Sequence, residues 1–227
     1  MTDTKNVRLA GIRGIIARKM QESLQGSAQL SFHMDCDVSS LITAREAYSK
    51  AGRRVSYEDL ICKSLSQVLR RFPAFNAHLV ENIIHYQDAQ HIAFAIAAPD
   101  GLMAPAVFNV QEKDVDYIAL ARRDLIERAS ARALSVEEMT GGTFTISNLG
   151  MTGVKYFTPI LNTPQVAILG LGAIWKQPEL GTDGELISKP YMGLSLTVDH
   201  RALDGLACGE FLAALCAVIG SLPGPLE

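Results

Sequence analysis

The sequence predicts a mixed α/β fold, in which helices cover a central sheet, and a single domain over all 227 residues. Segments with the 3.6-residue period of amphipathic helices are interspersed with segments that alternate or run apolar like strands. No linker, repeat or low-complexity tract separates them. The expected helices cover 11–24, 41–52, 56–72, 118–134, 136–140 and 206–219. The expected strands cover 30–38, 82–87, 91–108, 143–148, 165–174 and 193–200.

The first helix and the first strand follow from the spacing of their apolar residues. In 11–24, apolar side chains recur at helical intervals and polar residues take the other face. In 30–38, apolar residues alternate with mostly polar ones, as in a strand with one buried face. The apolar positions are Ile12, Ile15, Ile16, Met20 and Leu24 in the helix, and Leu30, Phe32, Met34, Cys36 and Val38 in the strand.

Local signals mark the ends of the next two helices. Gly52 stands where a glycine usually follows the last turn of a helix, which closes the segment 41–52. Ser56 begins the third helix, with Asp59 three residues later as an approximate capping box. This helix must end before Pro73, because a proline interrupts the helical hydrogen bonds.

The second half of the chain alternates strands, turns and helices. The turn sequence PDG at 99–101 divides the apolar stretch 91–108 into two strands. Ser135 and Glu138 form a capping box for the short helix that follows. Three strand-like runs and a closing helix complete the chain, and a turn rich in Gly and Asp joins the last two strands.

Composition and charge narrow the class of protein. The formal net charge of -3 excludes a strongly basic surface for nucleic acid or an anionic membrane. No apolar run approaches the ~18 residues of a membrane span, and the N-terminus has no signal-peptide core. The cysteines show neither a CxxC pair nor the spacing of a zinc site; they are Cys36, Cys62, Cys208 and Cys216. A cytoplasmic protein with reduced thiols is expected.

One candidate for chemistry is the stretch VDHRALDG at 198–205. If the strand continues through it, His200 shares the parity of the apolar side chains before it and points to the buried side. Burial would keep the imidazole neutral, as a general base requires. The same parity also fits a core histidine bonded to a backbone carbonyl. The two acids have simpler structural interpretations as well. Asp204 can be the N-cap of the last helix, and Asp199 can lie on the solvated face of the strand.

A second candidate is GGTFTISNLG at 141–150. The hydroxyls of Thr143, Thr145 and Ser147 share one parity, so Ser147 ends a row of hydroxyls at the mouth of a strand. A hydroxyl in this position could donate a hydrogen bond to a developing oxyanion. The alternative is that Ser147 and Asn148 only cap a turn.

The sequence lacks the motifs of two other chemistries. The pair of glycines in Gly170-Leu171-Gly172 has neither the third glycine nor the following helix of a dinucleotide loop, and no P-loop occurs. No carboxylate or thiol stands at ligand spacing from the remaining histidines, which are His33, His78, His85 and His91. No metal site is therefore expected.

Five blocks of the sequence together resemble the catalytic domain of the dihydrolipoamide acyltransferases of 2-oxo acid dehydrogenase complexes. In chain order they are GIRGIIARKM; FPAFNA followed by IAFAIAAPDGLMAPAVF; GGTFTISNLG; FTPILNTPQVAILGLG; and VDHRALDG. The resemblance extends from about Val7 to about Ile219, nearly the whole chain, in the order that the family shows. This family shares its fold with chloramphenicol acetyltransferase.

The resemblance implies a mixed sheet covered by helices, assembled as a homotrimer with active sites in channels between subunits. His200 matches the family's catalytic base, and Ser147 matches the hydroxyl that stabilises the transition state, the two coming from neighbouring subunits. Asp204 matches an acid that orients the loop by an ion pair with the arginine that Arg13 matches. Coenzyme A is expected to enter from one face of the trimer and a lipoyl arm from the other.

Two further residues and three functions follow from this resemblance. Phe157 and Leu169 are expected to form walls of the acyl pocket, with ordinary core packing as the alternative. The leading function is transfer of an acyl group between coenzyme A and a dihydrolipoyl thiol. The others are acylation of a small alcohol or amine by the same fold, and a non-catalytic trimeric scaffold. The blocks around His200 and Ser147 favour the first.

The sequence departs from the family at two places. Members usually carry lipoyl and subunit-binding domains ahead of the catalytic domain, whereas this sequence starts with the catalytic region, so neither domain is expected here. Glu112-Lys113-Asp114 also lacks the residue order of a lipoylation site. The lipoyl group is therefore expected from another chain or a small molecule. The C-terminal SLPGPLE contains Pro223 and Pro225, which break a helix, so the expected assembly stops at the trimer.

Overall fold

The structure is a computed structural model that describes residues 8–98, 101–181 and 183–223. Two residues of the expected PDG turn, Pro99 and Asp100, lie outside the described residues, as does Pro225 of the expected C-terminal break. Within the described ranges, no helix combines the length and the apolar character needed to cross a membrane.

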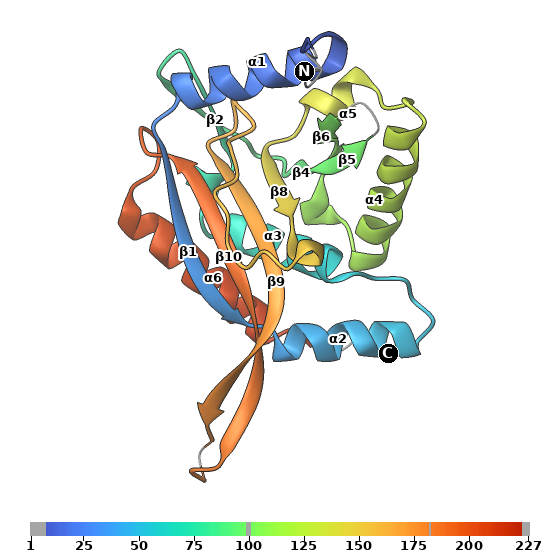
Figure 1. The fold of residues 1–227 in the computed structure, drawn as a ribbon, viewed down its shortest axis with the longest axis vertical. Coiled ribbons are helices and arrows are strands. Elements are labelled where there is room, and N and C mark those ends of the chain that lie inside the picture. Colours follow the sequence, from blue (N-terminus) through green and yellow to red (C-terminus); the bar gives the residue numbers. More distant parts are fainter. Residues whose placement is uncertain (1–7, 99–100, 182, 224–227) are drawn as a thin grey trace, which may run out of the picture.

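A six-stranded mixed sheet forms the centre of the molecule, in the order β1-β10-β9-β8-β4-β7 (Figure 1). β8 runs parallel to both of its neighbours, β4 and β9, whereas the other pairs are antiparallel. This confirms the predicted mixed sheet. The strands are β1 (Gln29–Asp37), β4 (Ile92–Phe94), β7 (Ala106–Val107), β8 (Phe144–Asn148), β9 (Ala167–Leu180) and β10 (Leu186–Asp199).

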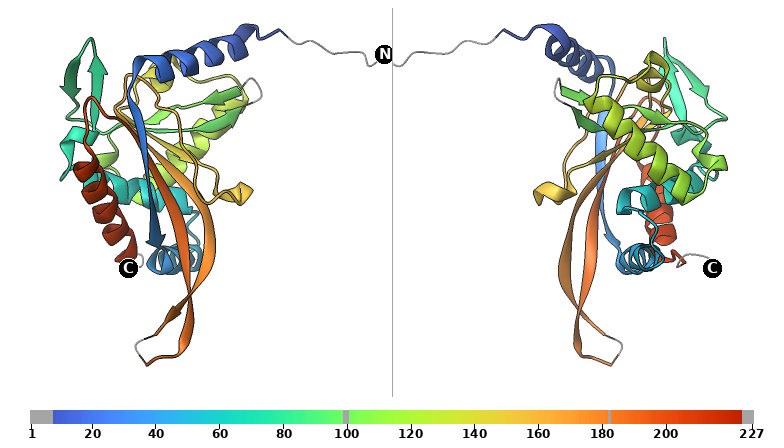
Figure 2. Two further views of the ribbon diagram at one scale, coloured as in Figure 1. Left: turned by 60° about the vertical axis from the view of Figure 1, so that its left-hand side comes forward. Right: turned by 90° about the vertical axis from the view of Figure 1, so that its right-hand side faces the viewer.

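Helices cover one face of this sheet and enclose the main hydrophobic core (Figures 1 and 2). Phe144 of β8 stacks on Phe211 with ring centroids 6.3 Å apart, and Phe75 stacks on the same ring at 4.2 Å. α1 lies across one end of the molecule (Figure 1). The helices are α1 (Gly11–Gly26), α2 (Ser39–Lys50), α3 (Tyr57–Leu69), α4 (Val115–Ser130), α5 (Val136–Thr140) and α6 (Gly205–Gly220).

Shorter elements connect these layers. β2 (Ala77–Val80) pairs with β3 (Ile83–Tyr86), and β5 (Ile96–Ala98) pairs with β6 (Gly101–Met103), each as a two-stranded antiparallel ribbon. The β5–β6 ribbon confirms the predicted division of 91–108 into two runs, whereas β2 was not predicted. Short 3-10 helices cover Pro73–Phe75, Val110–Glu112 and Gly150–Thr152.

The local signals that were expected to mark the starts and ends of helices are present in the structure. The Ser56 side chain accepts a hydrogen bond from the Asp59 backbone N–H, and the Asp59 carboxylate accepts one from the Ser56 backbone N–H. Ser135 and Glu138 form the same reciprocal pair at the start of α5. Gly52 follows α2 with φ of 74°, a conformation that favours glycine.

Some boundaries differ from the prediction. α4 begins earlier than expected, because the Asp114 carboxylate caps it by accepting a hydrogen bond from the Tyr117 N–H. β9 and β10 extend into a long twisted hairpin that projects from the sheet (Figures 1 and 2). Leu180 and Leu186 near its tip are each 76% exposed. Neither face of the tip is buried, so the alternation that predicts a strand is lost there.

Two glycines allow a loop to cross the face of the sheet opposite α3 and α6. A Cβ atom at Gly172 of β9 would lie 1.9 Å from the carbonyl oxygen of Lys155, and one at Gly193 of β10 would lie 2.1 Å from the same oxygen. Neither distance is possible for real atoms. The backbone at Lys155 therefore rests directly on the two strands, which only glycine permits.

Replacement of Gly172 by alanine is expected to lower the free energy of unfolding by about 1–3 kcal/mol, because the loop must move off the sheet. Urea unfolding followed by circular dichroism measures this change. Gly209→Ala in α6 is the control, since its added Cβ meets nothing within 4 Å. That variant is expected to gain up to about 1 kcal/mol from helix propensity. An unchanged stability of Gly172→Ala would contradict the loop placement.

Candidate active site

Ser147 lies near the end of β8 on the face of the sheet opposite the main core. Phe144 and Ile146 are fully buried in the core, whereas Thr145 and Ser147 face a cavity on the other side. The predicted alternation in β8 is thereby confirmed. Ser147 is half-buried, so its hydroxyl remains accessible from the cavity.

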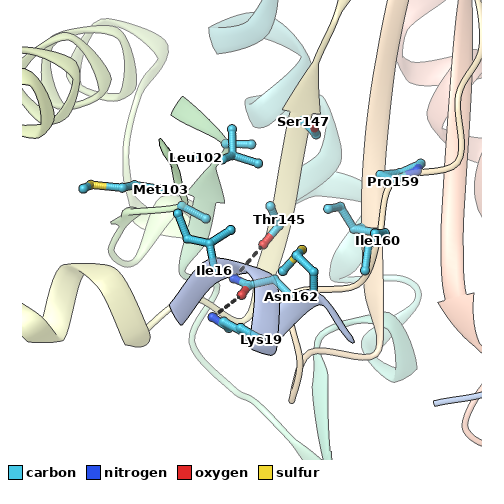
Figure 3. A pocket seen from close by; sticks show the side chains of 13 residues that line it. Ile16, Lys19, Leu102, Met103, Thr145, Ser147, Pro159, Ile160 and Asn162 are labelled. Carbon is cyan, nitrogen blue, oxygen red and sulfur yellow. Dashed lines mark hydrogen bonds between the residues drawn. The ribbon is translucent and has the colours of Figure 1, made fainter. Parts of the chain in front are cut away.

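A cavity of about 240 Å³ adjoins Ser147 (Figure 3). Its lining is mainly apolar and comes from α1, the β5–β6 ribbon with its flanking residues, β8, the segment before β9, and β9 itself. Figure 3 shows Ser147 toward one end of the cavity and Asn162 with Lys19 toward the other. The apolar lining residues include Ile16, Met20, Leu102, Met103, Ile160 and Ile168.

A chain of polar side chains crosses the far end of this cavity (Figure 3). The Lys19 Nζ donates a hydrogen bond to Asn162 Oδ1 at 2.7 Å, and Asn162 Nδ2 donates to Thr145 Oγ1 at 3.4 Å. The Thr145 hydroxyl in turn donates to Gln165 Oε1 at 2.6 Å. Burial lowers the pKa of Lys19 from its ordinary value. Sequence reasoning identified only Thr145 of this group, through the parity that it shares with Ser147.

His200 lies in a turn just beyond the end of β10 and is exposed in the single chain. Its backbone N–H donates a hydrogen bond to the Ala28 carbonyl at 2.8 Å. The burial expected from strand parity is therefore wrong for this chain. Alternation along the strand could not predict this, for two reasons. The strand ends before His200. In addition, Ser195 and Thr197, which alternate with the apolar residues, are buried as well, so both faces of the strand are covered.

Asp199, expected on the solvated face of the strand, is in fact only 3% exposed. Its carboxylate accepts hydrogen bonds from the Arg201 side chain, the shortest at 2.6 Å, and from the backbone N–H groups of Arg201 and Ala28. Burial acts to raise the pKa of Asp199, but these donors outweigh it and hold the pKa below its ordinary value. Asp199 therefore holds the turn that carries His200 in place through its hydrogen bonds with Arg201 and Ala28.

Asp204 caps α6, as its simpler interpretation predicted. Its Oδ1 accepts a hydrogen bond from the Ala207 backbone N–H at 2.9 Å. Arg13 is an exposed residue of α1, and within the described part of a single chain it forms no ion pair with Asp204. The expected pair of Arg13 and Asp204 stays a prediction from the resemblance.

Phe157 and Leu169 lie on opposite faces of β9. A Cβ atom at Gly170 would lie 2.7 Å from the Phe157 ring, so this ring covers Gly170, which pairs with Ser147 in the adjacent strand. Phe157 is therefore close to Ser147, and its role in an acyl pocket stays a prediction. Leu169 is fully buried within the main core, where the core-packing alternative placed it.

The strand register separates Ser147 from His200 within one chain. Ser147 pairs with Gly170 of β9, and Gly170 pairs with Ser195 of β10. His200 follows Ser195 by five residues, which corresponds to about 16 Å along a strand. A base and an oxyanion donor must both contact the reacting groups, so these two side chains of one chain cannot serve the same reaction.

The family comparison matches almost the whole chain. The model described as "2-oxoacid dehydrogenases acyltransferase (catalytic domain)" matches residues 1–223. A relative from Rickettsia felis, the dihydrolipoyllysine-residue acetyltransferase component of a pyruvate dehydrogenase complex, is 36% identical over 215 residues, or 92% of this chain and 52% of the relative. The mitochondrial dihydrolipoyllysine-residue succinyltransferase component of the 2-oxoglutarate dehydrogenase complex from Saccharomyces cerevisiae is 36% identical over 223 residues, or 96% and 48%. The chain spans about half the length of these relatives.

Solved structures of the same family have a similar fold. A probable dihydrolipoamide acetyltransferase from Listeria monocytogenes has a TM-score of 0.89 at 31% identity, over 97% of this chain and 96% of that one. The dihydrolipoamide acetyltransferase of Azotobacter vinelandii has a TM-score of 0.89 at 29% identity, over 96% and 92%. Chloramphenicol acetyltransferase, with a TM-score of 0.57 at 15% identity over 93% and 99%, shares the fold. The chain therefore belongs to the 2-oxoacid dehydrogenase acyltransferase family and has the fold of its catalytic domain.

Proposed function

We propose that this chain transfers an acyl group between coenzyme A and a dihydrolipoyl thiol. The observation that carries the proposal is the Ser147 hydroxyl, which adjoins an apolar cavity in a catalytic-domain fold of the acyltransferase family. The names of the relatives from Rickettsia felis and Saccharomyces cerevisiae assign acyl transfer on dihydrolipoyllysine to those proteins. An apolar cavity suits the acyl chain of a thioester, whose only polar atoms lie at the reacting end.

In the proposed reaction, His200 accepts the proton of the attacking thiol. The sulfur then forms a bond to the thioester carbonyl carbon, and the carbonyl electron pair moves to the oxygen. Ser147 donates a hydrogen bond to this oxyanion, a contribution of about 2.7–4 kcal/mol for one such donor in other enzymes. When the original carbon–sulfur bond breaks, the leaving thiolate takes the proton from His200.

We propose that Ser147 and His200 of neighbouring subunits form each site of a homotrimer. Their separation in one chain supports this arrangement. Exposed apolar side chains on α1 support it further, since Ile15 and Leu24 are 57% and 54% exposed although the helix pattern predicts burial. A second copy that covers α1 would bury them. Arg13 and Asp204 are then available for an ion pair formed only in the assembly.

The residue spacing around the proposed base matches that of a studied relative. The Azotobacter vinelandii structure was described with an investigation of a serine, a histidine and an asparagine in the catalytic mechanism. The histidine and the asparagine there are four positions apart, as are His200 and Asp204, and the serine precedes the histidine by about the same number of residues. This spacing supports the proposed roles and implies that Asp204 corresponds to the asparagine of that enzyme.

Space for two substrates exists around the end of β8. The cavity beside Ser147 lies on one face of the sheet, and a second cavity of about 360 Å³ adjoins Asn148, the next residue. The second cavity is lined by Glu58, Met151 and Met192 among others. Entry of the two thiols from opposite sides would let both meet at Ser147 without an acyl-enzyme.

The wild-type chain is expected to transfer an acetyl group from acetyl-coenzyme A to dihydrolipoamide, with His200→Ala slower by about 10²–10⁴-fold because the base is lost. Release of the coenzyme A thiol measures the rate, and sedimentation checks that the assembly is intact. His85→Ala, at an exposed histidine of β3, is the control with unchanged activity. Equal rates for His200→Ala and wild type would contradict the assignment of the base.

Replacement of Asp199 by asparagine is expected to destabilise the protein at pH 7 by about 1–3 kcal/mol, because some of its donors lose their acceptor. The pKa of Asp199 in the folded protein lies below its ordinary value of 3.8. The ionised carboxylate therefore contributes fully to the stability of the fold above pH 3.8, and this contribution is lost as the pH falls from 3.8 through the lower pKa of the folded state. Urea unfolding at neutral and acidic pH measures this. The difference from wild type should narrow at low pH, and Asp88→Asn, at an exposed carboxylate, is the control.

A further inference from the structure

A cluster of buried charged side chains lies behind the end of β8, on the side away from the cavity beside Ser147. Arg122 of α4 donates to the Asp59 carboxylate from Nε at 2.6 Å and to the Ser56 hydroxyl from Nη2 at 2.9 Å. Its Nη1 lies 3.4 Å from Glu58 Oε2. The guanidinium also lies over the Phe94 ring of β4, 5.9 Å from the centroid. The cluster therefore joins α3, α4 and the sheet.

The charges in this cluster do not balance. Two carboxylates face one guanidinium, and the exposed side-chain fractions are 13% for Arg122, 13% for Glu58 and 0% for Asp59. Burial raises the pKa of Glu58, and neither Arg122 nor the hydrogen bond from Asn148 offsets this, while the charge of Asp59 adds to it. An ionised Glu58 therefore costs the fold some stability, whereas Asp59 alone would suffice to neutralise Arg122.

Glu58 contacts the strand end that carries Ser147. The Asn148 Nδ2 donates to Glu58 Oε2 at 3.4 Å, and Asn148 Oδ1 accepts from the Gly150 N–H at 2.9 Å. The next residue, Leu149, donates its backbone N–H to the Leu171 carbonyl of β9 at 3.0 Å. Both the nitrogen and the oxygen of the Asn148 side-chain amide are therefore hydrogen-bonded. Asn148 follows Ser147 in β8 with its side chain on the opposite face, so contacts that hold Asn148 also restrict the backbone next to Ser147.

We propose that Glu58, held by Arg122, is a positioning residue that fixes the Ser147 hydroxyl through the side chain of Asn148. The proposal rests on the proposed function, in which that hydroxyl stabilises an oxyanion. Such a donor must be held within about 0.5 Å of its productive place by neighbouring residues whose own side chains are fixed. A residue with this role is expected to order the site even though it lowers the stability of the fold.

The test compares Glu58→Leu, which removes the acceptor at similar volume, with Glu58→Gln, whose amide oxygen keeps it. In Glu58→Leu, kcat for acyl transfer is expected to fall about 10- to 100-fold while KM for acyl-coenzyme A changes less than about threefold. Glu58→Gln is expected to retain most of the activity. The melting temperature of Glu58→Leu is expected to equal or exceed that of wild type, because Asp59 still pairs with Arg122.

A second measurement does not depend on catalysis. Hydrogen exchange of the segment 144–152, followed by mass spectrometry, reports on the Gly150 N–H that Asn148 protects. Exchange is expected to be faster in Glu58→Leu than in wild type and unchanged in Glu58→Gln. Glu46→Leu, at an exposed glutamate of α2, is the matched control for both measurements.

Three outcomes would overturn the proposal: unchanged exchange in Glu58→Leu, a loss of kcat that follows a lower melting temperature, or a change confined to KM. The last would mean that Glu58 acts on a substrate in the second cavity, which it lines, and not on Asn148. If the wild type transfers no acyl group at all, the proposed function fails, and the exchange measurement still decides whether Glu58 holds Asn148.

Discussion

The ladder of hydrogen bonds through β8, β9 and β10 determines where chemistry can occur in this fold. It holds Ser147, Gly170 and Ser195 side by side, and it leaves His200 beyond the end of the last strand. A shift of this register by one residue would turn each side chain to the opposite face, so the packed core resists it. The proposed base and the proposed oxyanion donor of one chain are therefore kept apart, which is the basis for the proposal that a second copy completes the site.

The two faces of the sheet serve different purposes. On one face, apolar side chains of the strands pack against α3 and α6, and this burial stabilises the fold. On the other, Gly172 and Gly193 admit a loop whose Phe157 ring covers Gly170. The same face carries the Ser147 hydroxyl and its cavity. Stability and accessibility are thus assigned to opposite sides of the same strands.

Local signals account for what could be predicted from the sequence. The capping boxes, the end of α2 at Gly52 and the alternation within β8 each depend on a few neighbouring residues. The exposure of His200 could not be predicted, because parity does not reveal where a strand ends or that both of its faces are buried. The contacts of Arg122 with Glu58 and of Lys19 with Asn162 join residues 64 and 143 positions apart, which only the fold brings together.

The most direct test of the shared site is complementation between two inactive variants. Ser147→Ala and His200→Ala chains, each with its own affinity tag, are coexpressed, and assemblies that carry both tags are isolated. In a mixed trimer one interface unites an intact Ser147 with an intact His200, so about one third of wild-type activity should return. Activity no greater than that of either variant by itself, in trimers shown to be mixed, would contradict a site built from two chains.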